Sequence, residues 1–227
     1  MPKIHLVTTC AKSKNGNIED TIYPVDITNL DMAFCEWTRR LKIRFDKKID
    51  VTQTESLYRG SHWDTALRIR NSRPDVSLWV ISAGLGLRHS SDPAIPYEAS
   101  FSNIPHENTQ VWDHHIHAPI FPGRVHSLVE LLHANNNDLF VVAASPLYLK
   151  AIEHDLLEGI KHVQNPKAQI IITTTHGYNG RLSTFVKYGS REMMGMLNSN
   201  MTTLNIKHAE KIISGIPVSF RNQYEAA

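Results

Sequence analysis

Residues 4–9, Ile-His-Leu-Val-Thr-Thr, form a short apolar run that ends in the polar segment Cys10-Ala-Lys-Ser-Lys. The length and composition of this run predict a buried strand. Similar runs occur at residues 77–82 (SLWVIS), 139–144 (LFVVAA) and 169–174 (QIIITT). Because helical patterns separate these runs, the sequence predicts an α/β fold: a single domain with a mostly parallel sheet and helices on both faces.

The helical patterns lie in the intervals between the predicted strands. In residues 28–46, apolar side chains repeat on one helical face, and Thr28 or Asn29 can cap the first turn. Further helices are expected at four places: from Ser61 onward, over residues 123–134, from Pro146 onward and over residues 202–214.

Composition limits the class of protein. Of the 227 residues, 41% are hydrophobic and 20% are charged, which excludes a disordered chain, and two cysteines are too few for a disulfide framework. No apolar run is long enough to span a membrane, and the start lacks the apolar region of a signal peptide. We therefore expect one cytoplasmic domain over residues 1–227, without a membrane partner. The formal net charge of +2 permits nucleic acid as a partner.

Residues 88–123 show no clear periodicity and are rich in Pro, Ser, Asn and His. A stretch of this length inside a compact domain predicts a functional loop, either a wall of a pocket or a lid. It contains His106, His114, His115 and His117, which could ligate zinc or iron. Neither a cysteine pair nor a His-Glu-x-x-His motif accompanies them, so we expect no metal site.

Small and hydroxylated segments follow each predicted strand, at residues 8–14, 82–87, 144–146 and 173–181. In open α/β sheets, ligands bind beyond the carboxyl ends of the strands, so these segments predict a binding crevice. Lysines in the first segment suit a phosphate. The chain lacks a Walker motif, and Gly84-Leu-Gly-Leu lacks the third glycine of a dinucleotide fingerprint, so no cofactor is expected.

Four motifs occur in order: Cys10-Ala-Lys-Ser-Lys, Leu57-Tyr-Arg-Gly-Ser, Ile81-Ser-Ala-Gly-Leu-Gly-Leu and Pro96-Tyr-Glu. This order resembles an uncharacterised α/β family related to the peroxide-stress protein YaaA and to domains of tRNA-guanine transglycosylase-like enzymes. It is also similar to an antiphage DNA glycosylase that acts on glucosylated hydroxymethylcytosine. The resemblance covers about residues 3–150. The chain departs from it at Glu98, where relatives often carry Asp.

The resemblance implies a DNA glycosylase that excises a modified base, such as a glucosylated one, from phage DNA in antiviral defence. Such an enzyme flips the nucleotide out of the stack and uses a carboxylate at the anomeric carbon. Glu98 is the candidate catalytic carboxylate, with Asp92 in reserve. Which base is attacked, whether the polymer is DNA or RNA, and the oligomeric state stay open.

The other candidate site residues are substrate contacts. Tyr58 and Tyr97 could stack on the flipped base, and hydroxyl groups at strand ends could bond base or sugar. The full set is Thr9, Cys10, Lys12, Lys14, Tyr58, Arg59, Gly60, Ser61, Ser82, Gly84, Arg88, Tyr97, Ser145, His176 and Arg181. Each has a structural alternative: tyrosines often pack in cores, and Ser145 fits the cap of the helix that Pro146 opens.

Other functions remain open at this level. One is a non-catalytic module that binds nucleic acid, and another is a metal-dependent nuclease that uses the His-rich stretch. A third is a transferase acting on free nucleotides, because the same crevice admits small molecules.

Overall fold

The computed structural model describes residues 3–217. Its central sheet has six strands in the order β4-β3-β1-β6-β7-β8. The parallel strands are β1 (Ile4–Thr9), β3 (Val76–Ser82), β6 (Leu139–Ala143), β7 (Ile170–Thr175) and β8 (Val186–Gly189), and the antiparallel edge strand is β4 (Gly86–His89). The predicted single α/β domain with a mostly parallel sheet is confirmed.

Strand β1 lies inside the sheet, between β3 and β6. Ile4 is in register with Val76 on one side and with Leu139 on the other. Residues Leu6 and Val7 have no exposed surface. Burial on both faces explains why the strand is a continuous apolar run without alternation.

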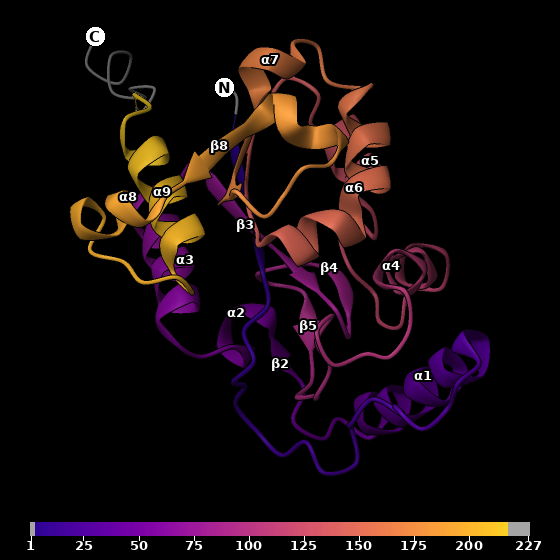
Figure 1. Ribbon diagram of the computed structural model, residues 1–227. Helices are drawn as coiled ribbons and strands as arrows, with labels where there is room; N and C mark the ends of the chain where they lie inside the picture. The colour runs from indigo at the N-terminus through magenta and orange to yellow at the C-terminus, as the bar shows by residue number, and fades with distance from the viewer. Residues whose placement is uncertain (1–2, 218–227) are drawn as a thin grey trace, which may run out of the picture.

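Helices cover both faces of the sheet, as Figure 1 shows. On one face lie α3 (Ser61–Ser72) and α9 (Leu204–Ser214), which contact each other. On the other face lie α4 (Asn108–His117), α5 (Leu128–Ala134) and α6 (Pro146–Ile160). The smaller elements are β2 (Thr52–Gln53), which pairs with β5 (Pro93–Ala94), α2 (Thr54–Leu57), α7 (Pro166–Gln169), the 3-10 helix η1 (Arg181–Phe185) and α8 (Arg191–Met196).

Helix α1 (Leu30–Asp46) begins where the sequence predicts, because the side chain of Asn29 accepts a hydrogen bond from the amide of Met32. Its buried face includes Trp37, whose indole donates to the carbonyl oxygen of Gly84 at 2.9 Å. The helix therefore supports the turn that follows β3, although Figure 1 shows it at the periphery of the molecule.

The expectation of a loop over residues 88–123 is wrong for part of that stretch. The segment contains β5 and the ten-residue helix α4. Helix α4 buries Val111, Trp112 and His115. Because a histidine takes a core position on this helix, the apolar repeat that reveals a helix is interrupted.

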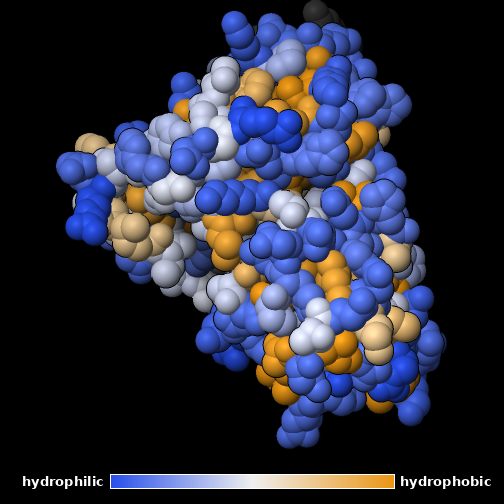
Figure 2. Space-filling model, turned by 45° about the vertical axis from the view of Figure 1, so that its right-hand side comes forward, coloured by the Kyte–Doolittle hydropathy of each residue, from blue (hydrophilic) through white to orange (hydrophobic). Residues whose placement is uncertain are grey.

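Within residues 3–217, no helix combines the length and the apolar character that crossing a bilayer requires. The face drawn in Figure 2 is mostly hydrophilic, and its hydrophobic residues lie in small separate patches.

The carboxylate of Asp155 joins three helices at one buried point. It accepts hydrogen bonds from the indole of Trp112 on α4 at 3.0 Å and from the amides of Leu128 and Val129 on α5 at 2.8 and 3.1 Å. Asp155 itself lies on α6 and is 5% exposed. It therefore satisfies the free amides at the start of α5.

We predict that Asp155→Ala lowers the free energy of unfolding by about 3 kcal/mol, because buried donors lose a charged acceptor. Urea denaturation measures this loss. The matched control is Asp113→Ala, which removes an exposed carboxylate from α4. Equal stability of the two variants would show that Asp155 does not hold the helices together.

Candidate functional site

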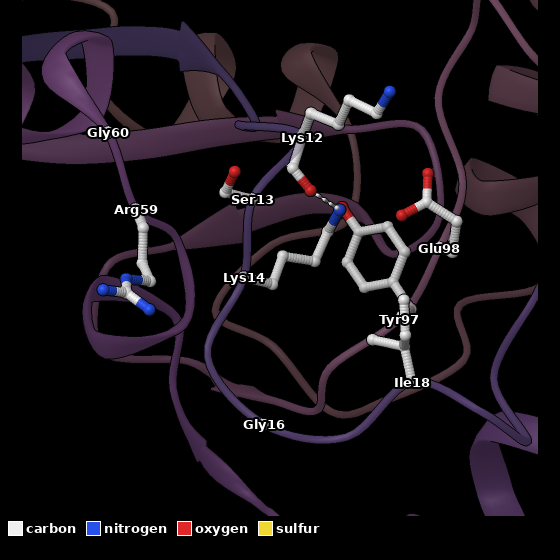
Figure 3. Close-up of a pocket in the computed structure, with 9 residues that line it drawn as sticks. All are labelled: Lys12, Ser13, Lys14, Gly16, Ile18, Arg59, Gly60, Tyr97 and Glu98. Atoms are coloured by element: carbon white, nitrogen blue, oxygen red, sulfur yellow. Dashed lines mark hydrogen bonds between the residues drawn. The ribbon is translucent and has the colours of Figure 1, made fainter.

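A cavity of about 660 Å³ lies next to the carboxyl end of β1. Figure 3 shows its lining, which comes from three separate parts of the chain: Lys12, Ser13, Lys14, Gly16, Ile18, Arg59, Gly60, Tyr97 and Glu98. The structure thus brings together Lys12, Lys14, Arg59, Gly60, Tyr97 and Glu98 from the predicted site. The volume suits a ligand of about the size of one nucleotide.

Backbone hydrogen bonds hold the three segments together. The amide of Arg59 donates to the carbonyl of Ser13 at 3.0 Å, and the amide of Asn15 donates to Leu57 at 2.8 Å. The segment with Glu98 is held by residues 21–23. The amide of Glu98 donates to the carbonyl of Thr21 at 2.8 Å, and the carbonyl of Glu98 accepts from the amide of Tyr23 at 2.9 Å. Both the amide and the carbonyl of Glu98 are therefore held by one neighbouring segment, as in a parallel strand pair.

Gly16 closes the turn beneath these segments. Its φ is +99°, and a Cβ at this position would lie 2.4 Å from Cγ of Pro96. Both the backbone conformation and the space require glycine. Sequence reasoning missed this residue, although Asn15-Gly16 is a recognised turn signal.

Tyr97 forms a rigid part of the cavity wall. Its hydroxyl shares hydrogen bonds with the hydroxyl of Ser82 at 2.6 Å and with that of Tyr58 at 3.0 Å. Burial raises the pKa of both tyrosines, so both phenols stay neutral. A Cβ on Gly84 would lie 2.5 Å from the Tyr97 ring. Ser82, Tyr58 and Gly84 therefore position Tyr97 from behind.

The ammonium group of Lys14 lies over the ring of Tyr97, 4.3 Å from its centroid. It also donates a hydrogen bond to the carbonyl of Lys12 at 3.0 Å. Burial lowers the pKa of Lys14, although the nearby Cys10 and Glu98 act in the opposite direction. The amine is thus partly withdrawn from water inside the cavity.

Three charged groups of the cavity are uncommitted, which means that they have no hydrogen-bond or ion-pair partner within residues 3–217. Within residues 3–217, the Lys12 ammonium, the Arg59 guanidinium and the Glu98 carboxylate form no hydrogen bond or ion pair with another side chain or with the backbone. By contrast, the buried Arg73 donates to Asp75 and to two backbone carbonyls. The cavity can therefore offer two cations and one carboxylate to a ligand.

Several predicted residues lie at the same edge of the sheet but outside the cavity lining. Thr9 ends β1, and the thiol of Cys10 shares a hydrogen bond with the Tyr148 hydroxyl at 3.2 Å. Ser61 is the exposed first residue of α3. Ser145 holds the cap position of α6, but its side chain makes no capping bond.

Arg88 and Asp92 do not lie in the cavity. Arg88 is 1% exposed, and its guanidinium donates to the carbonyls of Pro93, Phe121 and Pro122. Asp92 is 4% exposed and accepts from the amide of His89 at 2.8 Å. Burial keeps both charges from a ligand, so the structure gives them a packing role in place of the predicted phosphate contact and reserve carboxylate.

His176 and Arg181 are also separate from the cavity. His176 lines a second cavity of about 500 Å³ beyond β7 and β8, and its ring stacks on Tyr188 with centroids 4.7 Å apart. Arg181 is exposed and pairs with Glu153 at 3.2 Å. The predicted single crevice is therefore divided between two cavities.

The histidines of the His-rich stretch point to different partners. His114 donates to Asp31, the buried His115 donates to the carbonyl of Ala83, and His106 bonds the Tyr23 hydroxyl. Among residues 3–217, no group of three or more His, Cys, Asp or Glu side chains is arranged to hold a metal ion. The alternative of a nuclease with a metal held by these histidines therefore lacks a ligand cluster in this part of the chain.

Comparison with known proteins adds no relative: neither the family models nor the curated proteins searched match the chain. The resemblance drawn from the four motifs stays a prediction.

We predict that His115 makes the protein less stable in acid. Burial lowers the pKa of His115 to about 4, so between about pH 6.5 and 4 the unfolded chain binds a proton that the folded protein excludes. The stability due to neutral His115 is complete above this window and falls with the pH, by up to about 3 kcal/mol.

Urea denaturation of the wild type and of His115→Gln, at several pH values in this window, measures the effect. The wild type should lose stability more steeply than His115→Gln, and His117→Gln, which changes an exposed histidine of the same helix, should follow the wild type. Parallel curves for the wild type and His115→Gln would refute this role.

Proposed function

We propose that the protein is a DNA glycosylase that takes one flipped nucleotide into the cavity and hydrolyses its N-glycosidic bond. One observation carries this proposal. The uncommitted Glu98 carboxylate, the Tyr97 ring and the uncommitted cations of Lys12 and Arg59 line the same cavity of about 660 Å³. These are the groups that base excision needs: a carboxylate, an aromatic surface and phosphate clamps.

The cations would bind the phosphates on either side of the flipped nucleotide. In Figure 3, Arg59 lies across the cavity from Tyr97 and Glu98, whereas Lys12 lies on their side. Two cations at separate places suit a polymer backbone, in which successive phosphates flank each sugar.

Tyr97 is 0% exposed and the Lys14 ammonium lies over its ring, so a base would stack on Tyr97 by taking the place of Lys14. A cation–π contact contributes about 0.5–2 kcal/mol, and stacking of a base on an aromatic ring contributes about 1–3 kcal/mol. Replacing the cation–π contact by base stacking therefore changes the free energy of this ring contact little. The flexible Lys14 side chain can move aside, whereas Tyr97 stays fixed by Ser82 and Tyr58.

Glu98 would act at the anomeric carbon. Breaking the N-glycosidic bond develops positive charge on the sugar, which an ionised carboxylate stabilises, or the carboxylate takes a proton from the attacking water. The fixed backbone of Glu98 supports either role, because the approach of the carboxylate to the sugar is then limited to side-chain rotation.

The nature of the base comes from the motif resemblance. It supports a modified base, such as a glucosylated one, in phage DNA, and with it a role in antiviral defence. Since that substrate is present in the cytoplasm, the proposal places the protein there.

We predict that Glu98→Gln lowers base release by about 10²- to 10⁴-fold, because the amide can neither stabilise the cationic sugar nor accept a proton. The assay offers unmodified DNA, glucosylated phage DNA and tRNA, and reads free bases by mass spectrometry. DNA binding should survive in this variant. The control is Glu107→Gln, which changes an exposed carboxylate.

Base release at the wild-type rate by Glu98→Gln would remove Glu98 from the mechanism. Binding of DNA by the wild type without release of any base would favour the non-catalytic binding module instead.

We predict that Lys12→Ala and Arg59→Ala each weaken DNA binding and lower the slope of log K against log salt by about 1, because each removes a phosphate contact. Fluorescence anisotropy over a range of salt concentrations measures this slope. Lys167→Ala changes an exposed lysine in α7, which precedes β7 and so lies at the opposite edge of the sheet. It should keep the wild-type slope, and the same slope in all variants would place Lys12 and Arg59 outside the interface.

A further inference from the structure

We infer that the protein has a second activity: it cleaves the DNA strand at abasic sites through a covalent imine between the sugar and the amine of Lys14. This inference rests on the proposed function, because that reaction produces the abasic sugar inside the same cavity. The geometry of Lys14, Tyr97 and Glu98 carries it.

The amine of Lys14 is held inside the cavity. It lies 4.3 Å from the centroid of the Tyr97 ring and donates to the carbonyl of Lys12 at 3.0 Å. The Lys12 side chain is exposed, and Arg59 carries a guanidinium that does not form imines. Lys14 is therefore the amine of this cavity that is placed for covalent chemistry.

The surroundings of Lys14 favour its neutral form. Burial is the largest influence and lowers the pKa of Lys14; the positive charge of Lys12 acts in the same direction, whereas Cys10 and Glu98 act in the opposite one. Desolvation and a neighbouring cation are the two conditions that activate nucleophilic lysines in enzymes. They increase the fraction of free amine at neutral pH.

Substrate binding would bring this amine toward the sugar. When a base stacks on Tyr97, it takes the place of the Lys14 ammonium on the ring. The backbone of Lys14 is paired with Tyr58 and stays in place, so the displaced amine moves only by rotation of its side chain about a fixed point at the cavity. The sugar occupies the space between the stacked base and the phosphate-binding cations, within the reach of a lysine side chain.

The chemical steps balance without an oxidant or a reductant. Hydrolysis of the base leaves a deoxyribose whose open form has an aldehyde at C1′. The neutral Lys14 amine adds to C1′, the aldehyde oxygen leaves as water, and the resulting imine takes up one proton. These steps are those of Schiff-base catalysis by lysine.

Elimination then breaks the strand. The Glu98 carboxylate accepts a proton from C2′, and the electron pair of that C–H bond expels the 3′ phosphate as the C3′–O bond breaks. Addition of water to the remaining imine frees Lys14. The products are an unsaturated aldehyde on one fragment and a 5′ phosphate on the other.

The test uses a DNA duplex with one abasic site, prepared beforehand by excision of uracil with a separate enzyme. The protein is incubated with this duplex and sodium cyanoborohydride, which reduces an imine to a stable amine. We expect a covalent protein–DNA adduct that peptide mass spectrometry maps to Lys14, and strand cleavage when the reductant is absent. Base release from modified DNA is measured in parallel.

Lys14→Arg keeps the positive charge but cannot form an imine, so it should lose both the adduct and the cleavage. Lys167→Arg, at the opposite edge of the sheet, should keep both. Circular dichroism and thermal unfolding show whether Lys14→Arg folds, and mapping of the wild-type adduct tests the inference without that variant. No adduct, or an adduct at another residue, would overturn it.

The two proposals fail separately. Base release without an adduct would overturn the lyase inference and leave the glycosylase proposal standing. An adduct with preformed abasic DNA, but no base release from any substrate, would support the role of Lys14 and contradict the glycosylase proposal.

Discussion

The hydroxyl of Ser82, at the end of β3, ties the cavity to the sheet. It accepts hydrogen bonds from the amides of Gly84 and Leu85 at 3.3 and 3.0 Å and shares one with the Tyr97 hydroxyl at 2.6 Å. The carbonyl of Gly84 is held in turn by Trp37 of α1. Since an unsatisfied buried hydroxyl costs about 1–3 kcal/mol, each partner depends on the others. The position of Tyr97 in the cavity wall is therefore fixed by its hydrogen bond to a residue of the sheet.

Two pairs of cationic side chains have different physical roles. Arg73 and Arg88 are buried, and each donates hydrogen bonds to backbone carbonyls of distant segments, so both guanidinium groups stabilise loops. Lys12 and Arg59 are exposed, and within residues 3–217 their charged groups have no partner. Which of the two roles a cationic residue has depends on long-range contacts, because the carbonyls that accept hydrogen bonds from a buried guanidinium come from segments far along the chain.

The fold could be predicted because its strands are buried on both faces. Runs such as those at β1 and β6 then stand out from the helices between them. The residues of the cavity could be predicted where they follow a strand, as Lys12 and Lys14 do, because parallel strands bring their carboxyl ends to one edge.

The errors have physical causes as well. Arg88 follows a strand end in the sequence, but the chain reverses into β4 and turns this residue into the core. Strand β8 was missed because it has only four residues and lies at an edge, where apolar side chains are not required. Gly16 was missed because its importance depends on Pro96, eighty positions away.

The place of β1 inside the sheet also bears on how the chain acquires its structure during synthesis. Leu139 on β6 pairs with Ile4, so one side of β1 stays open until 135 further residues have been made. At typical rates of translation this takes roughly 7 to 27 s. During that time an apolar strand exposes free backbone groups that can pair with other chains. Until β6 has been made, β3 is the strand that can pair with β1, and the other side of β1 stays open.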